Sequence, residues 1–236
     1  MELTTFILLI VIGYLLGSLP LSFLVAKWRG TDLRKQGTGQ VGGGNLWRTT
    51  SRKLGLIIGV FDFVKGMIMV AIAFSQGLEV YQQTIIGLAV VIGHNWPVFL
   101  KFHGGRGAAT TLGLVLFIPA INQNVSPWSA IVVLVIVVLG SIVLRSTPVP
   151  TILAAASLPI SYWALGSDTG TVLAFLGIFL AIALKRLMSQ TAAERPPISN
   201  GRLLLNRFFF DRDFGDRKAW MAGEHIDDDD ILNEVK

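Results

Sequence analysis

Long unbroken apolar runs are the feature that most constrains how this chain can fold. Of its 236 residues, 52% are hydrophobic and only 15% are charged, whereas an ordinary soluble domain is about a quarter charged. Apolar residues that come in continuous blocks, and not in amphipathic periods, indicate membrane spans. The sequence therefore predicts an all-α integral membrane protein.

About seven of these runs approach the ~20 apolar residues that a helical span requires. The first begins after Glu2 instead of a basic stretch, and no small-residue cleavage site follows it. We therefore expect a retained span and not a signal peptide. The fourth run is short, which fits a tilted or partly re-entrant helix. The runs lie roughly at residues 4–26, 54–75, 82–101, 107–121, 128–145, 149–166 and 170–187.

The basic residues predict the orientation. Apart from Lys65, every Lys and Arg falls in alternate connections or in the tail, and such residues are in excess in cytoplasmic segments. We expect the N-terminus outside, a membrane domain over 1–188, and a polar cytoplasmic tail over 189–236 that is partly disordered or interfacial. This asymmetry and anionic lipid head groups explain the net charge of +5, so no nucleic-acid partner is needed.

A glycine-rich loop occupies residues 30–53, after the first run, and contains GTGQVGGGNLWR. This segment formally matches the dinucleotide fingerprint, but that motif needs a preceding strand, and here an apolar helix precedes it. Backbone N–H groups of consecutive small residues can instead converge on an anion. Thr38, Gln40 and Asn45 add neutral donors, and Arg48 adds a forked cation suited to phosphate. A flexible interfacial turn that contacts lipid is the alternative.

A second glycine-rich loop, at 101–107, ends in Arg106 just before a predicted helix. Free N–H groups and the dipole make a helix N-terminus attractive to anions. Two such loops on one membrane face indicate a ligand with two anionic groups, or two anionic ligands. His94 lies just before this loop, in the apolar part of the chain. Because no set of metal ligands surrounds it, an interhelical hydrogen bond is the simpler role.

Two charged residues, Asp62 and Lys65, lie inside the second run and share one helix face, three residues apart. Charged groups at membrane depth are costly and face the bundle interior or a wet cavity. Either the two neutralise each other as a structural pair, or they hold the active-site loops together.

Four sequence blocks occur in a specific order: GSLP, LRKQGTGQVGGGNLWR, DFVKG and GHNWPVFLKFHGGRGAAT. Their order and spacing resemble the bacterial acyl-phosphate:glycerol-3-phosphate acyltransferase family over roughly residues 10–112. The resemblance implies a seven-span inner-membrane enzyme with its N-terminus outside. Such an enzyme moves a fatty acyl group from acyl phosphate to the 1-hydroxyl of glycerol 3-phosphate, giving lysophosphatidate and phosphate. It implies no nucleotide, coenzyme A or metal, and makes the enzyme that supplies acyl phosphate a candidate partner.

The resemblance also assigns roles to site residues. Thr38, Gly39 and Asn45 would hold the acyl-phosphate head, and Arg48 and Arg106 would neutralise the substrate phosphates. Catalysis would be mostly positioning and electrostatic stabilisation of the oxyanion. No metal site is predicted. The implied catalytic residues are Thr38, Asn45, Arg48 and Arg106, and the implied substrate-binding residues are Gly37, Gly39, Gln40, Gly42, Asp62, Lys65, His94, Gly104, Gly105 and Gly107.

The chain departs from the family pattern at two places that matter for chemistry. Arg106 stands where the family has a lysine, and an arginine keeps the charge but cannot transfer a proton. The family's Arg-His-x-x-Asn block at the end of the seventh run has no counterpart in ALKRLMS at 183–189. Either Lys185 and Arg186 replace it, or the chemistry is weakened, altered or absent. A non-catalytic paralogue that binds anionic lipid or lipid precursors is therefore the alternative function.

The tail carries two further patterns. Aromatic and basic residues at 207–210 could lie on the membrane surface. His225 and Asp230 are spaced as in a coenzyme A-using acyltransferase class, but they lie in a polar, acidic run. We interpret that spacing as coincidence.

Overall fold

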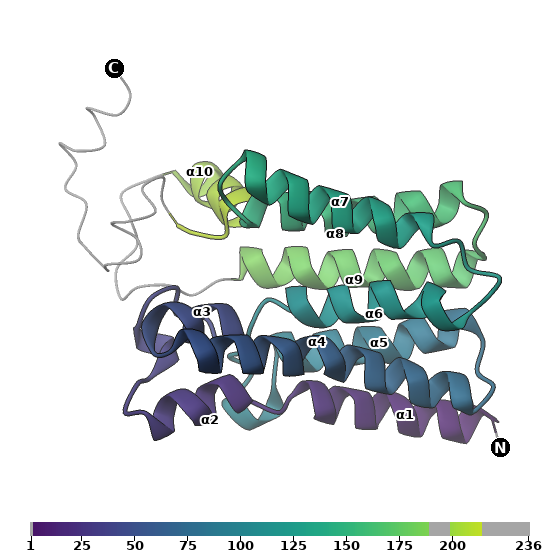
Figure 1. Cartoon of the computed structure of the whole chain (residues 1–236), viewed down its shortest axis with the longest axis horizontal. Coiled ribbons are helices and arrows are strands. Elements are labelled where there is room, and N and C mark those ends of the chain that lie inside the picture. Colours follow the sequence, from purple (N-terminus) through teal and green to yellow (C-terminus); the bar gives the residue numbers. More distant parts are fainter. Residues whose placement is uncertain (1, 189–198, 214–236) are drawn as a thin grey trace.

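The computed structural model describes residues 2–188 and 199–213, and every regular element within these ranges is helical. The long helices run side by side in a bundle (Figure 1). Short elements lie in the connections and after the bundle: η1 (Leu33–Lys35), α3 (Gly43–Thr49), η2 (Val98–Leu100), α10 (Asn200–Leu205) and the π-helical η3 (Asn206–Phe210). The bundle helices are α1 (Glu2–Gly17), α2 (Leu21–Trp28), α4 (Arg52–Ser75), α5 (Val80–Asn95), α6 (Ala108–Ile121), α7 (Trp128–Val143), α8 (Pro148–Ala164) and α9 (Thr169–Leu187).

Four helical segments of the described chain are long and apolar enough to cross a membrane. The prediction of an all-α membrane protein is thus confirmed. The count of seven spans and the sidedness of the termini stay predictions. Helices α6 and α7 are apolar but shorter. The four segments are Leu3–Trp28, Arg52–Ser75, Val80–Leu100 and Thr169–Leu187.

The first apolar run is interrupted. Pro20 has no backbone N–H to donate to a helix ladder, and the chain leaves α1 at Gly17 and enters α2 only at Leu21. The break leaves the Gly17 carbonyl available to a side chain, and it accepts a hydrogen bond of 3.2 Å from Nζ of Lys65. The proline therefore places a backbone acceptor next to a buried cation.

Glycines let α1 and α5 approach closely, as is common between membrane helices. A Cβ at Gly93 would overlap the Tyr14 carbonyl, and one at Gly17 would overlap the Val90 carbonyl. Gly17, the glycine of the GSLP block, thus allows close packing against α5 and also precedes the break between α1 and α2.

We expect Gly93→Ala to destabilise the bundle by about 1–3 kcal/mol, because overpacking a close contact forces the helices apart. The matched control is Gly59→Ala in α4, where an added Cβ meets nothing within 4 Å. That variant should be neutral or slightly stabilising, since alanine favours helix over glycine. Thermal unfolding in detergent compares the two, and equal behaviour would contradict close packing of α1 on α5.

The glycine loops and the segment after the bundle lie at the same end of the molecule, opposite the N-terminus (Figure 1). Residues 199–213 of the predicted tail form α10 and η3, and Leu203 there is buried. The His225 and Asp230 pattern lies outside the described residues. Both glycine loops and the segment 199–213 therefore lie together at the end of the bundle that carries the candidate site.

Candidate functional site

Asn45, in α3, organises the first glycine loop. Its side chain is 3% exposed. Its Nδ2 lies 3.0 Å from each of the carbonyl oxygens of Leu33, Gln36 and Gln40, and its Oδ1 accepts from the Thr38 N–H at 3.0 Å. The amide is thus directed into its own loop, where it fixes the backbone path.

The loop around Thr38 is bent by two glycines with positive φ, 59° at Gly37 and 66° at Gly39, a conformation that glycine adopts without steric cost. The bend buries the Thr38 side chain, and its hydroxyl has no hydrogen-bond partner among the described residues. A buried polar group without a partner calls for an explanation. The hydroxyls of Thr111 and Tyr162 within the bundle share this state, so it does not by itself mark a ligand site.

Asp62, Lys65 and His94 form a charged cluster under the loops. Nζ of Lys65 lies 2.9 Å from Oδ1 of Asp62 and 2.8 Å from Nδ1 of His94, and Oδ1 of Asp62 is 3.4 Å from Nδ1 of His94. Because His94 belongs to α5 and the other two to α4, the interhelical contact expected for His94 is present. Lys65 is 0% exposed, so the cluster is internal.

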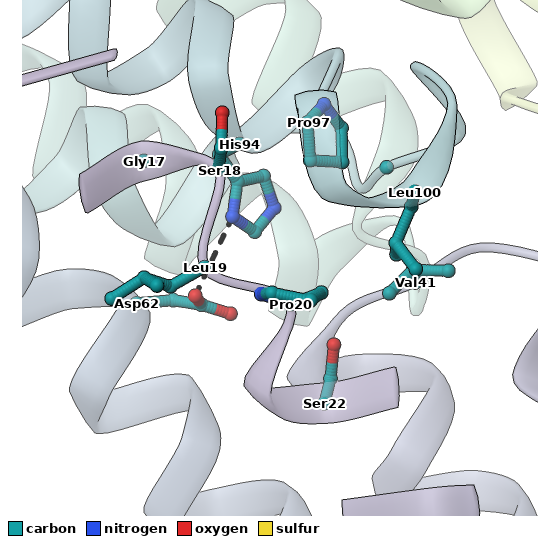
Figure 2. A pocket seen from close by; sticks show the side chains of 11 residues that line it. Gly17, Ser18, Leu19, Pro20, Ser22, Val41, Asp62, His94, Pro97 and Leu100 are labelled. Carbon is teal, nitrogen blue, oxygen red and sulfur yellow. Dashed lines mark ion pairs between the residues drawn. The ribbon is translucent and has the colours of Figure 1, made fainter. Parts of the chain in front are cut away.

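A small polar pocket is lined in part by Asp62 and His94 of this cluster (Figure 2). The rest of its lining comes from the α1–α2 break, the first turn of α2, the segment around η2 and one residue of each glycine loop. Val41 of the first loop and Gly104 of the second both contribute, so the loops converge here. The lining is completed by Gly17, Ser18, Leu19, Pro20, Ser22, Pro97 and Leu100.

The second loop is fitted closely over His94. The Gly105 N–H donates to the His94 carbonyl at 3.0 Å, and a Cβ at Gly105 would overlap the imidazole Nε2. A Cβ at Gly104 would overlap the His94 carbonyl. Gly107 precedes α6 with φ 68°, a left-handed conformation that favours glycine. These three glycines thus keep the second loop against α5.

Arg106 connects the second loop to distant parts of the chain. Its NH2 lies 2.8 Å from Oδ1 of Asp211, and its NH1 donates to the Lys185 carbonyl at 2.6 Å. Oδ2 of the same Asp211 accepts from Nε2 of Gln40 at 2.9 Å. One carboxylate thus joins a predicted phosphate ligand from each glycine loop.

The end of α9, where the family histidine and asparagine were expected, has other contacts. Arg186 is 3% exposed and donates to the carbonyls of Phe208 and Pro148, both at 2.9 Å. Nζ of Lys185 lies 5.4 Å from the centre of the Trp96 ring. Arg186 therefore attaches the segment 199–213 to the bundle, and Lys185 lies near the second loop.

Of the predicted site residues only Asp62, His94 and Gly104 line the pocket, and the first loop contributes Val41 instead of any predicted residue. Arg48 is exposed in the last turn of α3, and Gly42 precedes α3 with extended backbone. Ser18 of the GSLP block was not predicted as a site residue, yet it lines the pocket and donates to the Tyr14 carbonyl at 2.8 Å. Asp211 was also missed, and no local pattern indicated it.

Comparison with known proteins gives consistent results. A family model described as "Glycerol-3-phosphate acyltransferase" matches residues 7–192. Glycerol-3-phosphate acyltransferase 4 of Dehalococcoides mccartyi (strain CBDB1) is 35% identical and covers 92% of this chain and 93% of its own. Glycerol-3-phosphate acyltransferase of Aquifex aeolicus is 37% identical over 73% of this chain and 79% of its own. A crystal structure of PlsY, an integral membrane glycerol 3-phosphate acyltransferase, in its glycerol 3-phosphate form superposes with a TM-score of 0.71. It is 29% identical and covers 89% of this chain and 96% of its own.

Proposed function

Since this chain belongs to the glycerol-3-phosphate acyltransferase family, we propose that its two glycine loops bind the phosphates of acyl phosphate and glycerol 3-phosphate. The reaction joins the 1-hydroxyl of glycerol 3-phosphate to the acyl carbonyl. The bond from that carbonyl to phosphate breaks, and the hydroxyl proton leaves with the phosphate. The product is lysophosphatidate, and no cofactor takes part.

The observation that carries this proposal is the convergence of both loops on one polar pocket next to the buried cation of Lys65. An acyl phosphate has an apolar tail and an anionic head, so its site has to lie where apolar helices end and phosphate donors begin. The Thr38 hydroxyl and the loop N–H groups supply neutral donors. Arg106 supplies a planar cation suited to phosphate oxygens.

We assign two kinds of role within this site. Thr38, Arg48 and Arg106 contact substrate, Arg48 from the exposed rim of α3. Asn45 acts through the loop that it shapes, because its amide is directed at four backbone groups of that loop. Since phosphate is already a good leaving group, positioning and charge stabilisation carry most of the catalysis.

The proposed membrane topology is supported by the distribution of the basic residues. We propose about seven spans, with the N-terminus outside and the loops and tail in the cytoplasm of a bacterial inner membrane. The chain contains no cysteine, so single cysteines introduced at Gln76, in the exposed connection between α4 and α5, and at Gln36 can be tested with a membrane-impermeant thiol reagent added outside intact cells, which should label Gln76 alone. Labelling of both positions from the same side would contradict this topology.

Phosphate release tests the function directly. We expect the purified protein, given palmitoyl phosphate and glycerol 3-phosphate, to release phosphate only when both substrates are present. An Arg106→Ala, Asn45→Ala double variant is the blank. If the wild type releases no more phosphate than this blank yet binds both substrates, the chain is a non-catalytic paralogue. The missing Arg-His-x-x-Asn block is the feature that would then account for the loss.

Arg48→Lys tests the rim of the site. Lysine keeps the charge but loses the fork that binds two phosphate oxygens, so we expect KM for one phosphate-bearing substrate to rise roughly ten- to a hundredfold, equivalent to about 1.5–3 kcal/mol for a charged hydrogen bond. Steady-state kinetics with each substrate varied in turn measures this. Unchanged KM values for both would make Arg48 a lipid-contacting surface charge.

A further inference from the structure

The Asp211 carboxylate bridges the two glycine loops. Its Oδ1 lies 2.8 Å from NH2 of Arg106 and its Oδ2 accepts from Gln40 at 2.9 Å. The two side chains of the Arg106–Asp211 pair are 10% and 13% exposed, so water screens the pair only partly. A residue beyond the last bundle helix thus contacts both loops that carry the proposed phosphate ligands.

The segment that carries Asp211 is fixed to the bundle by contacts that do not involve Asp211. Arg186 donates to the Phe208 carbonyl at 2.9 Å, and NH1 of Arg207 donates to the Leu187 carbonyl at 3.2 Å. Within the segment, Nε of Arg207 pairs with Asp213 at 2.6 Å. The segment is therefore placed independently, and its carboxylate acts as a fixed partner for Arg106 and Gln40.

Asp211 constrains the direction of the Arg106 guanidinium. One edge of this planar group donates to the Lys185 carbonyl through NH1, and NH2 pairs with Asp211. A guanidinium held by two partners has little rotational freedom left, so it loses less entropy when it binds a phosphate. A binding site works best when the residues around a functional side chain hold it in the orientation that binds the ligand.

We propose that Asp211 is a positioning residue of this acyltransferase, which orients Arg106 and Gln40 toward the substrate phosphate. The proposal rests on the proposed function and deepens it. The segment after α9 then completes the site at the end of the bundle where the family's Arg-His-x-x-Asn block is missing. The opposite role, in which the carboxylate competes with phosphate for Arg106, predicts a lower KM when Asp211 is removed.

The experiment compares Asp211→Ala with wild type in the phosphate-release assay with palmitoyl phosphate and glycerol 3-phosphate. We expect KM to rise roughly ten- to a hundredfold, as for the loss of a charged hydrogen bond, for the same substrate whose KM Arg106→Ala raises. The change in kcat should be smaller. In the Arg106→Ala background the same substitution should change KM much less than in the wild type, because only the contact of Asp211 with Gln40 is then left to lose.

Asp213→Asn is the matched control. It removes a carboxylate charge two residues away that pairs with Arg207, and it leaves an oxygen that can still accept. It should keep KM near the wild-type value. A KM increase as large as that of Asp211→Ala would show that loosening the segment, or losing any carboxylate near Arg106, is enough, and would overturn a specific role for Asp211. A lower KM or faster release in Asp211→Ala would overturn the proposal in favour of a competing anion.

A silent wild type would count against the proposed function and not against this positioning role. Calorimetric titration of glycerol 3-phosphate into wild type and Asp211→Ala then tests the positioning alone. Weaker binding in the variant supports it. The proposal is overturned if Asp211→Ala binds glycerol 3-phosphate as tightly as the wild type does, and also binds palmitoyl phosphate as tightly as the wild type does.

Discussion

Lys65→Met is expected to lower the free energy of unfolding by about 3–5 kcal/mol, the usual cost of breaking a buried ion pair by removing one partner. Lys65 is 0% exposed, and its Nζ contacts Asp62, His94 and the Gly17 carbonyl. Methionine fills a similar volume but leaves the Asp62 carboxylate buried without its cation. Denaturant or thermal unfolding in detergent micelles measures the loss.

Adding Asp62→Asn to Lys65→Met tests whether charge causes that loss. The double variant has no uncompensated charge, and the new amide can still reach Nδ1 of His94. We therefore expect it to recover at least half of the lost stability, because a fully neutral replacement of a buried pair is often close to neutral. Equal losses in the single and double variants would instead point to the contact with the Gly17 carbonyl.

The sequence predicted the long helices well where bilayer length and apolar composition act together. The expected runs at 54–75 and 170–187 correspond to α4 at Arg52–Ser75 and α9 at Thr169–Leu187. Caps fix both starts, since Ser51 and Asp168 accept from N–H groups of the first turn. The break between α1 and α2 was not predicted, because the first run is apolar throughout. Hydropathy carries no information about the backbone hydrogen bond that Pro20 cannot donate. Helix α3 was not predicted either, because three consecutive glycines at its start are typical of a loop.

The site was harder to predict than the fold. The basic connections and glycine density predicted two loops at one membrane face, and both loops line the pocket. The sequence contains no comparable pattern that predicts the direction in which a side chain points. Asn45 was predicted as a substrate donor, and its amide is directed into its own loop. The contact between Gln40 and Asp211 joins residues 171 positions apart, which only the packing of the segment after α9 on the bundle creates.

Asn45→Asp is expected to reduce the rate of phosphate release about 10²–10³-fold, comparable to the loss of a transition-state donor. Aspartate has nearly the same shape as asparagine but no N–H, so three loop carbonyls lose their donor. It also adds a negative charge next to the proposed phosphate site. Asn45→Asp should lower the free energy of unfolding by about 1–3 kcal/mol, less than Lys65→Met, since the loop lies at the end of the bundle.

Two comparisons decide whether the loop shape is the reason. Asn124→Asp adds the same charge at an exposed position in the connection between α6 and α7, and it should leave the rate unchanged. Asn45→Ala loses the same donors without adding a charge. If the alanine variant loses as much rate as the aspartate variant, loop shape dominates, whereas a much smaller loss assigns the effect to repulsion of phosphate. An Asn45→Asp enzyme with a wild-type rate would contradict both, because the loop would then hold its shape without the amide and the phosphates would bind elsewhere.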